Sequence, residues 1–529
     1  MSLRIQPVLS LAWIAIAALS VDACVTRIKG GAGAPGVISP DLESWIALQR
    51  RESFDRLLRN VAPGVPPFTR RVEAKYVAPE RLALLRQAVA SGMVSFERGL
   101  LEQVIVPKPG SVVAAPAPQP PEPDYFFHWV RDSAIVMREL ADLELSGAAP
   151  RPDDLGRRLA DFTTFSRELQ SSPSPAGLGE VRYNADGTQD FLKWSRPQLD
   201  GPALRALALM RYAETPRSAG VAEAVTPVLC TDLDFIASNW THRGFDLWEE
   251  YNGHDYYALS VQAGALEEGA RWAAEIGDDA RAKEYAAQRS RILDVLDGYW
   301  SNEKGYLGFF HGPTTYWDQS IREKPGGNLD SAVLLAALHG RRRAGRHSLM
   351  DERVLATVVK LEDLFASLYL VNRGRAPGDG VVIGRYEGDT YHGGNPFVFT
   401  TLGFAEVHYR LALILARAEH FQITSLNSEF VHRALVRAES HEPLEPGIDA
   451  LAVPRNRAAL LRGLVLRGDD VLRAVYLLVR WKAGGLSEQF VQEIGAGPSS
   501  HDLSWSHAAF LSATDARREA VSLLLAGPG

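Results

Sequence analysis

Helical patterning runs through almost the whole of this chain of 529 residues. Apolar residues recur at helical spacing near the start, in segments 41–58 and 79–90. The same spacing recurs in segments 133–145, 153–171, 201–215, 219–240, 255–276, 279–298, 328–345, 351–371, 395–418, 424–439, 456–482 and 504–526. No segment alternates convincingly as a strand, so no sheet is predicted. The pattern therefore predicts an all-α fold, arranged as one closed ring of helix pairs.

The loops between these segments are long, and they are rich in Gly, Trp, Tyr and carboxylates. They cover residues 172–200, 241–254, 299–327, 372–394 and 483–503. Long polar and aromatic loops between regular helices are the usual place for functional residues. No sequence repeat of fixed period is visible, which argues against a simple solenoid. We therefore expect the loops to carry the function.

Composition excludes some classes of protein. A hydrophobic fraction of 46% places the chain among ordinary globular proteins. A formal net charge of -7 is a poor fit to nucleic-acid binding, which needs a concentrated basic surface, so no nucleic-acid partner is expected. The only two cysteines, Cys24 and Cys230, rule out a disulfide framework within the domain. No His/Cys/Asp cluster has the spacing of metal ligands, so no metal or cofactor is predicted.

The first residues have the features of an export signal. Arg4 precedes an apolar run over 8–21, which is too short for a comfortable membrane span. We predict an export signal over residues 1–23 and a single domain over 24–529, located in the periplasm or outside the cell. Cleavage after residue 23 would leave Cys24 at the new N-terminus, where a lipid anchor is an open alternative. The mature protein is expected to be a monomer.

Two adjacent glutamates, Glu249 and Glu250, stand between Trp248 and Tyr251 in one of these loops. Adjacent glutamates are most often a solvated surface pair, because Glu is rarely buried without a partner. Large rings beside carboxylates favour a different interpretation, a sugar-binding cleft that offers an apolar face and an acid. The stretch is therefore a candidate site that needs a counterpart elsewhere in the chain.

Other loop stretches offer such counterparts. Arg131 and Asp132 are either a structural ion pair under a helix start or a pair that binds sugar hydroxyls, with Tyr125 and Trp129 as walls. Trp194 lies in a polar loop, where a Trp is costly unless it packs or binds something. Asp200 stands where a helix N-cap is expected. Glu488 on its own would be interpreted as a cap or surface residue.

Taken together, six stretches resemble the fungal-type glucoamylases of glycoside hydrolase family fifteen. They occur in family order within residues 40–529 and are very specific as a set. They read DYFFHWVRDSA at 124–134, GLGEVRYN at 177–184, WSRPQLDGPALR at 194–205, DLWEEYNG at 246–253, GRYEGDTYHGGNP at 384–396, and SEQF with DLSWSHAA at 487–490 and 502–509.

This resemblance implies an (α/α)6 barrel with a pocket at one end. It also implies inverting, exo-acting hydrolysis of α-linked glucose from non-reducing ends. By position, Glu249 would be the general acid and Glu488 the general base. Inversion needs the two carboxyl groups about 6.5–9.5 Å apart across the sugar, which residues so distant in sequence meet only in a closed architecture. The substrate-binding residues that the resemblance implies are Tyr125, Trp129, Arg131, Asp132, Trp194, Trp248, Glu250, Arg385 and Trp505.

Departures from the family pattern keep alternatives open. Phe397 stands where the family commonly has an indole, and segment 186–193 differs, so the acceptor side could favour another linkage or chain length. No carbohydrate-binding module is expected, which favours soluble maltooligosaccharides over starch granules. One alternative is a related α-glucoside hydrolase with α-1,6 or α,α-1,1 preference. Another is a non-catalytic barrel that binds glycans or regulates a partner, against which the presence of both Glu249 and Glu488 argues.

Overall fold

The computed structural model describes residues 40–526 except 120, 216–219, 343, 376–378, 441–443, 481–483 and 491–498. The predicted export signal over 1–23 and the possible lipid anchor at Cys24 lie outside the described residues, so both stay predictions. The helices are α2 (Pro40–Arg59), α3 (Leu82–Ala90), α4 (Val130–Ser146), α5 (Leu155–Ser171), α6 (Gly201–Ala213), α7 (Val221–Asn239), α8 (Tyr256–Glu275), α9 (Asp279–Leu296), α10 (Ala332–His339), α11 (Glu352–Leu368), α12 (Val398–Arg417), α13 (Ser428–Arg437), α14 (Pro454–Val479) and α15 (Ser504–Ala526).

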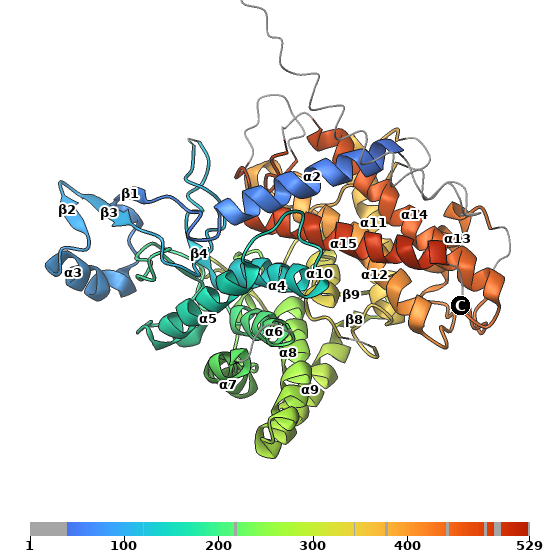
Figure 1. Cartoon of the computed structure of the whole chain (residues 1–529), viewed down its shortest axis with the longest axis horizontal. Coiled ribbons are helices and arrows are strands. Elements are labelled where there is room, and N and C mark those ends of the chain that lie inside the picture. The colour runs from blue at the N-terminus through green and yellow to red at the C-terminus, as the bar shows by residue number, and fades with distance from the viewer. Residues whose placement is uncertain are drawn as a thin grey trace, which may run out of the picture.

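Helices α4, α6, α8, α10, α12 and α15 form an inner ring in which each packs against the next and α15 packs back on α4. Helices α2, α5, α7, α9, α11 and α14 pack on the outside of this ring, and α13 packs on α11 and α14. Figure 1 shows the resulting arrangement, with α2, the first helix of the described residues, lying along α15, the last of them. The predicted closed ring of helix pairs is confirmed.

Burial separates the two layers. The inner helix α12 has 16 of its 20 residues buried, whereas the outer helix α9 buries only 4 of 18. Helix α12 is long and apolar enough to cross a membrane by composition, but 89% of its most apolar stretch is buried inside the molecule. The inner helices also approach closely, because a Cβ at Gly264 of α8 would lie 2.2 Å from the carbonyl oxygen of Gly340. Glycine is therefore needed where α8 meets the end of α10.

The predicted helices are found with small differences at their ends, apart from segment 328–345. There the helix α10 covers only Ala332–His339. The chain turns at Gly340, after which Arg341 and Gly345 adopt left-handed backbone angles, with φ of 44° and 83°. A residue with left-handed backbone angles cannot continue a right-handed helix, so the helix is shorter than the apolar spacing of segment 328–345 predicts.

The prediction that no sheet forms is wrong. A three-stranded antiparallel sheet joins β1 (Phe68–Glu73), β3 (Leu100–Ile105) and β2 (Ser95–Glu97) in that order. Along β3 the buried residues are Leu101, Gln103 and Ile105, while Leu100 and Val104 are exposed. Burial therefore alternates along β3, but hydrophobicity does not, because a glutamine lies on the buried face and apolar residues lie on the exposed face.

The remaining strands are short and lie in the loops. They are β4 (His128–Trp129) paired with β5 (Arg182–Tyr183), β8 (Trp300–Ser301) paired with β9 (Tyr306–Leu307), and a sheet of β10 (Thr315–Tyr316), β7 (Tyr251–Gly253) and β6 (Gly244–Phe245). These strands hold the loops that we predicted to carry the function. They matter most at residues 246–250, which β6 and β7 flank.

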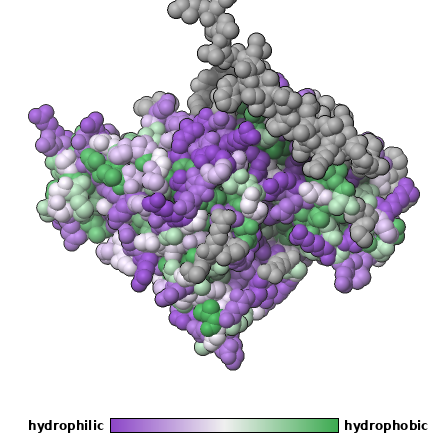
Figure 2. Space-filling model, viewed as in Figure 1, coloured by the Kyte–Doolittle hydropathy of each residue, from purple (hydrophilic) through white to green (hydrophobic). Residues whose placement is uncertain are grey.

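The β1–β3 sheet and α3 form a small unit that projects from the ring at the left of Figure 1. In Figure 2 green residues are visible among purple ones over this projection, whose exposed apolar side chains include Met93, Phe96 and Val104. Residues 76–78 of this unit form backbone hydrogen bonds with the loop before Trp194. The Lys193 amide donates to the Tyr76 carbonyl at 2.9 Å, and the Ala78 amide donates to the Phe191 carbonyl at 2.9 Å. The small unit is therefore connected to one of the predicted site loops.

Candidate active site

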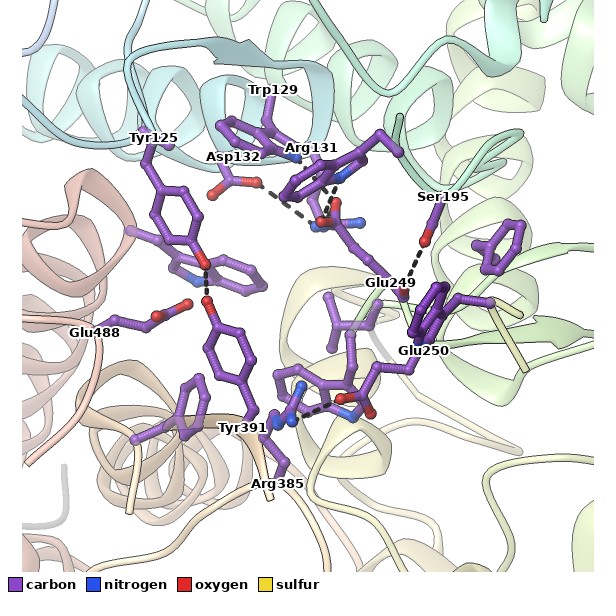
Figure 3. A pocket seen from close by; sticks show the side chains of 18 of the residues that line it. Tyr125, Trp129, Arg131, Asp132, Ser195, Glu249, Glu250, Arg385, Tyr391 and Glu488 are labelled. Carbon is purple, nitrogen blue, oxygen red and sulfur yellow. Dashed lines mark hydrogen bonds and ion pairs between the residues drawn. The ribbon is translucent and has the colours of Figure 1, made fainter. Parts of the chain in front are cut away.

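A cavity of about 730 Å³ lies at the loop end of the inner helices. Its volume falls within the range of small-ligand sites. All eleven residues predicted from the sequence line its wall: Tyr125, Trp129, Arg131, Asp132, Trp194, Trp248, Glu249, Glu250, Arg385, Glu488 and Trp505. Figure 3 shows Glu488 on one side of the cavity and Glu249 on the other. Loops separated by more than 350 residues in the sequence thus meet around one space.

The inner end of the cavity is closed by an aromatic stack. The rings of Phe399 and Trp505 lie 4.2 Å apart and nearly parallel, and both are buried. They line this cavity on one face and a separate, much smaller cavity between the inner helices on the other. Within the described residues, the large cavity is therefore a pocket with a floor.

The turn that carries the two glutamates is built by Asp246. Its carbonyl accepts a hydrogen bond from the Glu249 amide at 2.9 Å, and its side chain accepts from the amides of Glu250 and Tyr251 at 2.9 and 3.2 Å. Glu249 adopts a left-handed φ of 65°, which costs energy in a residue with a side chain. Burial raises the pKa of Asp246 to about 6. The turn thus holds Glu249 in a conformation that the chain alone disfavours.

The Glu249 carboxylate is fixed by four side-chain donors. Its Oε1 accepts from the Trp129 indole at 2.9 Å, from Arg131 at 3.1 Å and from the Gln198 amide at 2.9 Å. Its Oε2 accepts from the Trp194 indole at 2.6 Å. These donors come from two stretches, 124–134 and 194–205, so the position of this carboxyl group depends on both of them.

The adjacent Glu250 belongs to a different network. Its carboxylate accepts from Arg385 at 2.9 Å and from the hydroxyl of Tyr386. Arg385 is held from its other side by Asp389, whose Oδ2 lies 2.7 Å from Nε. The two neighbouring glutamates therefore contact different partners. This agrees with the different roles that were predicted for them.

Arg131 and Asp132 lie in the first turn of helix α4. Arg131 donates to Gln198 at 2.8 Å and to Asp200 at 2.9 Å, in addition to Glu249. Asp200 precedes α6 as predicted, but its side chain makes no cap hydrogen bond and pairs with Arg131. Burial raises the pKa of Asp132 to about 7 although Arg131 is close, because the carboxyls of Glu249 and Asp200 act in the same direction as burial.

Glu488 is held by its backbone. Its amide donates to the Ser500 carbonyl at 3.0 Å, and its carbonyl accepts from the Val398 amide at the start of α12 at 2.9 Å. Burial raises the pKa of its carboxyl to about 7 against the opposing effects of Ser499 and Arg385. Its Oε2 is buried and has no hydrogen-bond partner among the described residues. A buried carboxylate oxygen without a protein partner is a natural acceptor for a water molecule.

Two aromatic contacts complete the pocket. The hydroxyls of Tyr125 and Tyr391 contact each other beside Glu488 (Figure 3). The Trp248 indole donates to Asp330 at 2.9 Å, and its ring packs against Phe397. Trp248 therefore offers a ring edge or face to the pocket and turns its polar end away from it. Phe397 is itself 2% exposed, and it lies under Trp248.

Sequence reasoning missed several residues that shape the site. Gln198, Asp200, Asp389 and Tyr391 all stand within the six stretches, but none was predicted as a site residue, and Asp200 was expected only as a helix N-cap. Each of the first three holds a glutamate or arginine that was recognised. Polar residues inside a recognised motif were the available signal, although the sequence does not say which partner each one contacts.

A family model described as Glycosyl hydrolases family 15 matches residues 98–515. Glucoamylase 1 of Rhizopus oryzae is 30% identical over 406 residues, covering 75% of this chain and 65% of its own length, so the match spans slightly less than two thirds of that relative. Glucoamylase-1 of Schizophyllum commune is 30% identical over 431 residues, covering 78% of this chain and 69% of its own.

A solved structure shows the same likeness in three dimensions. The glycoside hydrolase family 15 glucoamylase from Hypocrea jecorina matches with a TM-score of 0.72 and 26% sequence identity. The match covers 90% of this chain and 72% of that one. The ring of helix pairs is therefore the predicted (α/α)6 barrel.

Proposed function

The chain belongs to glycosyl hydrolase family 15, and we propose that it is a glucan 1,4-α-glucosidase that releases β-D-glucose from non-reducing ends of α-1,4-linked glucans and maltooligosaccharides. The observation that carries this proposal is the placement of Glu249 and Glu488 on facing sides of one floored pocket. Such a pocket accepts a chain end, which favours exo action. Two carboxyl groups across a sugar ring, with room for a water between them, are what inversion requires.

Glu249 is proposed as the general acid. Its carboxyl group would protonate the glycosidic oxygen as the bond to the anomeric carbon breaks, and the indoles of Trp129 and Trp194 would keep it oriented. Glu488 is proposed as the general base. Its free Oε2 would accept a proton from the water that attacks the anomeric carbon on the opposite face. The two steps together invert the configuration, so the α-linked unit leaves as β-glucose.

The remaining polar groups of the pocket suit the binding of a terminal glucose. Arg131, Asp132 and Arg385 are buried charged groups at the inner end, and hydrogen bonds between such groups and sugar hydroxyls are strong. Tyr125, Trp129 and Trp505 would supply apolar walls for the same ring. Glu250 and Trp194 are proposed to bind the next unit.

A panel of substrates with proton NMR detection tests this proposal. We expect glucose release from maltose through maltoheptaose, with the β-anomer appearing first because the base delivers water to the face opposite the leaving oxygen. Initial α-glucose would rule out inversion. Cleavage of isomaltose or trehalose without cleavage of the maltose series would favour the alternative linkage. No release from any of them would favour the non-catalytic barrel.

The raised pKa of Glu488 sets a pH dependence. A base must be ionised, and the ionised fraction of a group with a pKa of about 7 grows as the pH rises through that value. We therefore expect the acid limb of kcat/KM to have its midpoint well above about 4.3, the ordinary glutamate pKa. Asp132→Asn removes a like charge, so it should move this midpoint to lower pH.

The control for this pH profile is Glu387→Gln, at an exposed glutamate in the same loop as Arg385. It should leave the midpoint unchanged. Because Asp132 and Glu488 titrate close together, the midpoint belongs to the pair, and the informative result is its shift. A midpoint near the ordinary glutamate value, or one that Asp132→Asn does not move, would contradict the assignment of Glu488 as the base.

A further inference from the structure

The mouth of the pocket is lined by side chains that belong to none of the six stretches. They are Glu80, Lys193, Trp317 and Gln319, and all four are exposed. Trp317 is 61% exposed, whereas Trp129 and Trp505 at the inner end are 5% and 4% exposed. Single exposed apolar residues are common on protein surfaces and need no explanation by themselves. An exposed indole on the wall of a sugar pocket differs, because a binding partner would cover it.

Trp317 stands at the tip of a tight hairpin that is well braced. The Tyr316 amide donates to the Ser320 carbonyl at 2.8 Å, and the Gln319 amide donates back to the Tyr316 carbonyl at 2.8 Å. Between them the Asp318 carboxylate accepts from the Ser320 amide at 2.9 Å and from Arg322 at 2.7 Å. The bonds close the turn on both sides of Trp317 and restrict its backbone.

The same hairpin is bonded to the strand beside the proposed acid. Tyr316 of β10 pairs with Tyr251 of β7, and their rings lie 5.0 Å apart. Tyr251 directly follows Glu250 in the chain. Trp317 is therefore positioned by one small sheet relative to Glu249 and Glu250, so a sugar chain extending outward from those carboxyl groups would meet the indole in a defined place.

A second part of the mouth comes from the small N-terminal unit. Glu80 lies in the 3₁₀ turn Pro79–Arg81, which is anchored by Arg81. The Arg81 side chain is 1% exposed and donates to Glu180 at 2.5 Å and to Gln189 at 2.9 Å. Glu80 precedes residue 98, where the family match begins. The family model therefore assigns no role to this part of the mouth.

The chemistry of these side chains suits a neutral sugar ring. An indole buries the apolar face of such a ring and keeps one N–H free for a hydrogen bond. The Glu80 carboxylate accepts hydrogen bonds from hydroxyls, and the Lys193 ammonium donates them. No ion pair between these two groups is found among the described residues, so both heads are available to a ligand.

We propose that Trp317 determines chain-length preference by stacking on the third glucose unit from the non-reducing end, with Glu80 and Lys193 binding the hydroxyls of that unit. This inference rests on the proposed function. It makes maltotriose and longer chains better substrates than maltose, because a disaccharide ends before it reaches the indole.

The test compares kcat/KM for maltose and maltopentaose in the wild-type protein, Trp317→Ala and Trp317→Phe. We expect Trp317→Ala to lower the value for maltopentaose by about two- to tenfold, the range of one aromatic contact, and to leave maltose within about twofold. Trp317→Phe should keep most of the activity on maltopentaose. The matched control is Phe96→Ala, at a 51% exposed ring outside the pocket, which should change neither value.

A binding measurement separates recognition from turnover. Maltopentaose titrated into Glu249→Gln by calorimetry should bind more weakly when Trp317→Ala is added, by a similar factor. Equal effects of Trp317→Ala on maltose and maltopentaose, or no effect on either, would overturn the role of Trp317 while leaving the proposed function standing. If the wild-type protein released no glucose from either sugar, the proposed function would fail and this inference with it.

Discussion

Replacing Glu249 or Glu488 by glutamine is expected to lower kcat by about 10²- to 10⁴-fold, the contribution of a positioned acid or base. Glutamine keeps the shape of the side chain, but its amide can act neither as a general acid nor as a general base. At Glu249 the amide oxygen could still accept from Trp129 and Arg131, and the hydrogen bond from Trp194 would be lost. The pocket should therefore keep its form. At Glu488 the loss of charge removes the acceptor for the attacking water.

The measurement is steady-state hydrolysis of maltopentaose, with thermal unfolding followed in parallel to show that the variants fold. Glu387→Gln serves as the control, because it changes an exposed glutamate of the GRYEGD stretch and should retain normal turnover. Near-normal turnover of either active-site variant would exclude the role assigned to that residue. A large loss in the control would show that charge in this loop matters in general, and the assignment would lose its support.

Glu180→Gln is expected to destabilise the protein by about 3–5 kcal/mol, the cost of breaking a buried ion pair from one side. Glu180 is 2% exposed and accepts hydrogen bonds from Arg81 and Arg196, both at 2.5 Å. Those guanidinium groups lower its pKa against the opposing effect of burial. Glutamine cannot compensate two buried arginines, although Asp190 would still pair with Arg196 at 2.7 Å.

The pH dependence of this effect has a definite sign. Because the pKa of Glu180 is lower in the folded protein than in the unfolded chain, its stabilisation is complete above about pH 4.3 and is lost as the pH falls through the folded value. Denaturant unfolding at pH 7 and at pH 3 should therefore show a large difference from wild type at pH 7 that narrows at pH 3.

The control for that experiment is Glu102→Gln, which breaks an exposed pair with Arg71 and should cost less than about 1 kcal/mol. A loss of similar size in both variants would contradict the argument. So would a difference between Glu180→Gln and wild type that stays constant from pH 7 to pH 3.

The helices and the site stretches were predictable from the sequence for different reasons. Helical spacing is a local property, so α4 to α15 could be located from the chain itself, with errors only where glycine and a left-handed residue end α10. The site stretches were recognised as a set, since a single pair such as Glu249 and Glu250 is far more often a surface feature. Their meeting in one pocket depends on closure of the ring, which the helix pattern implied.

The remaining parts depend on contacts between distant residues. Gln103 faces inward on β3 because it bonds Thr188, so polarity gave the wrong face and the sheet was missed. Asp200 was predicted as a cap from its position before α6, but the nearness of Arg131 decides its actual partner. Trp317 was not predicted as a site residue, because its loop belongs to none of the six stretches. Only the pairing of β10 with β7 brings it to the pocket mouth.

The aromatic floor formed by Phe399 and Trp505 would limit how a polymer moves through the proposed site. A chain end that enters above that floor has no exit behind it, so the severed glucose and the shortened chain share one way out. The shortened chain has to withdraw, at least in part, before the sugar beneath it escapes. An enzyme built in this way acts distributively, re-engaging a chain end for every glucose removed, whereas a tunnel open at both ends lets a polymer slide forward from one cut to the next.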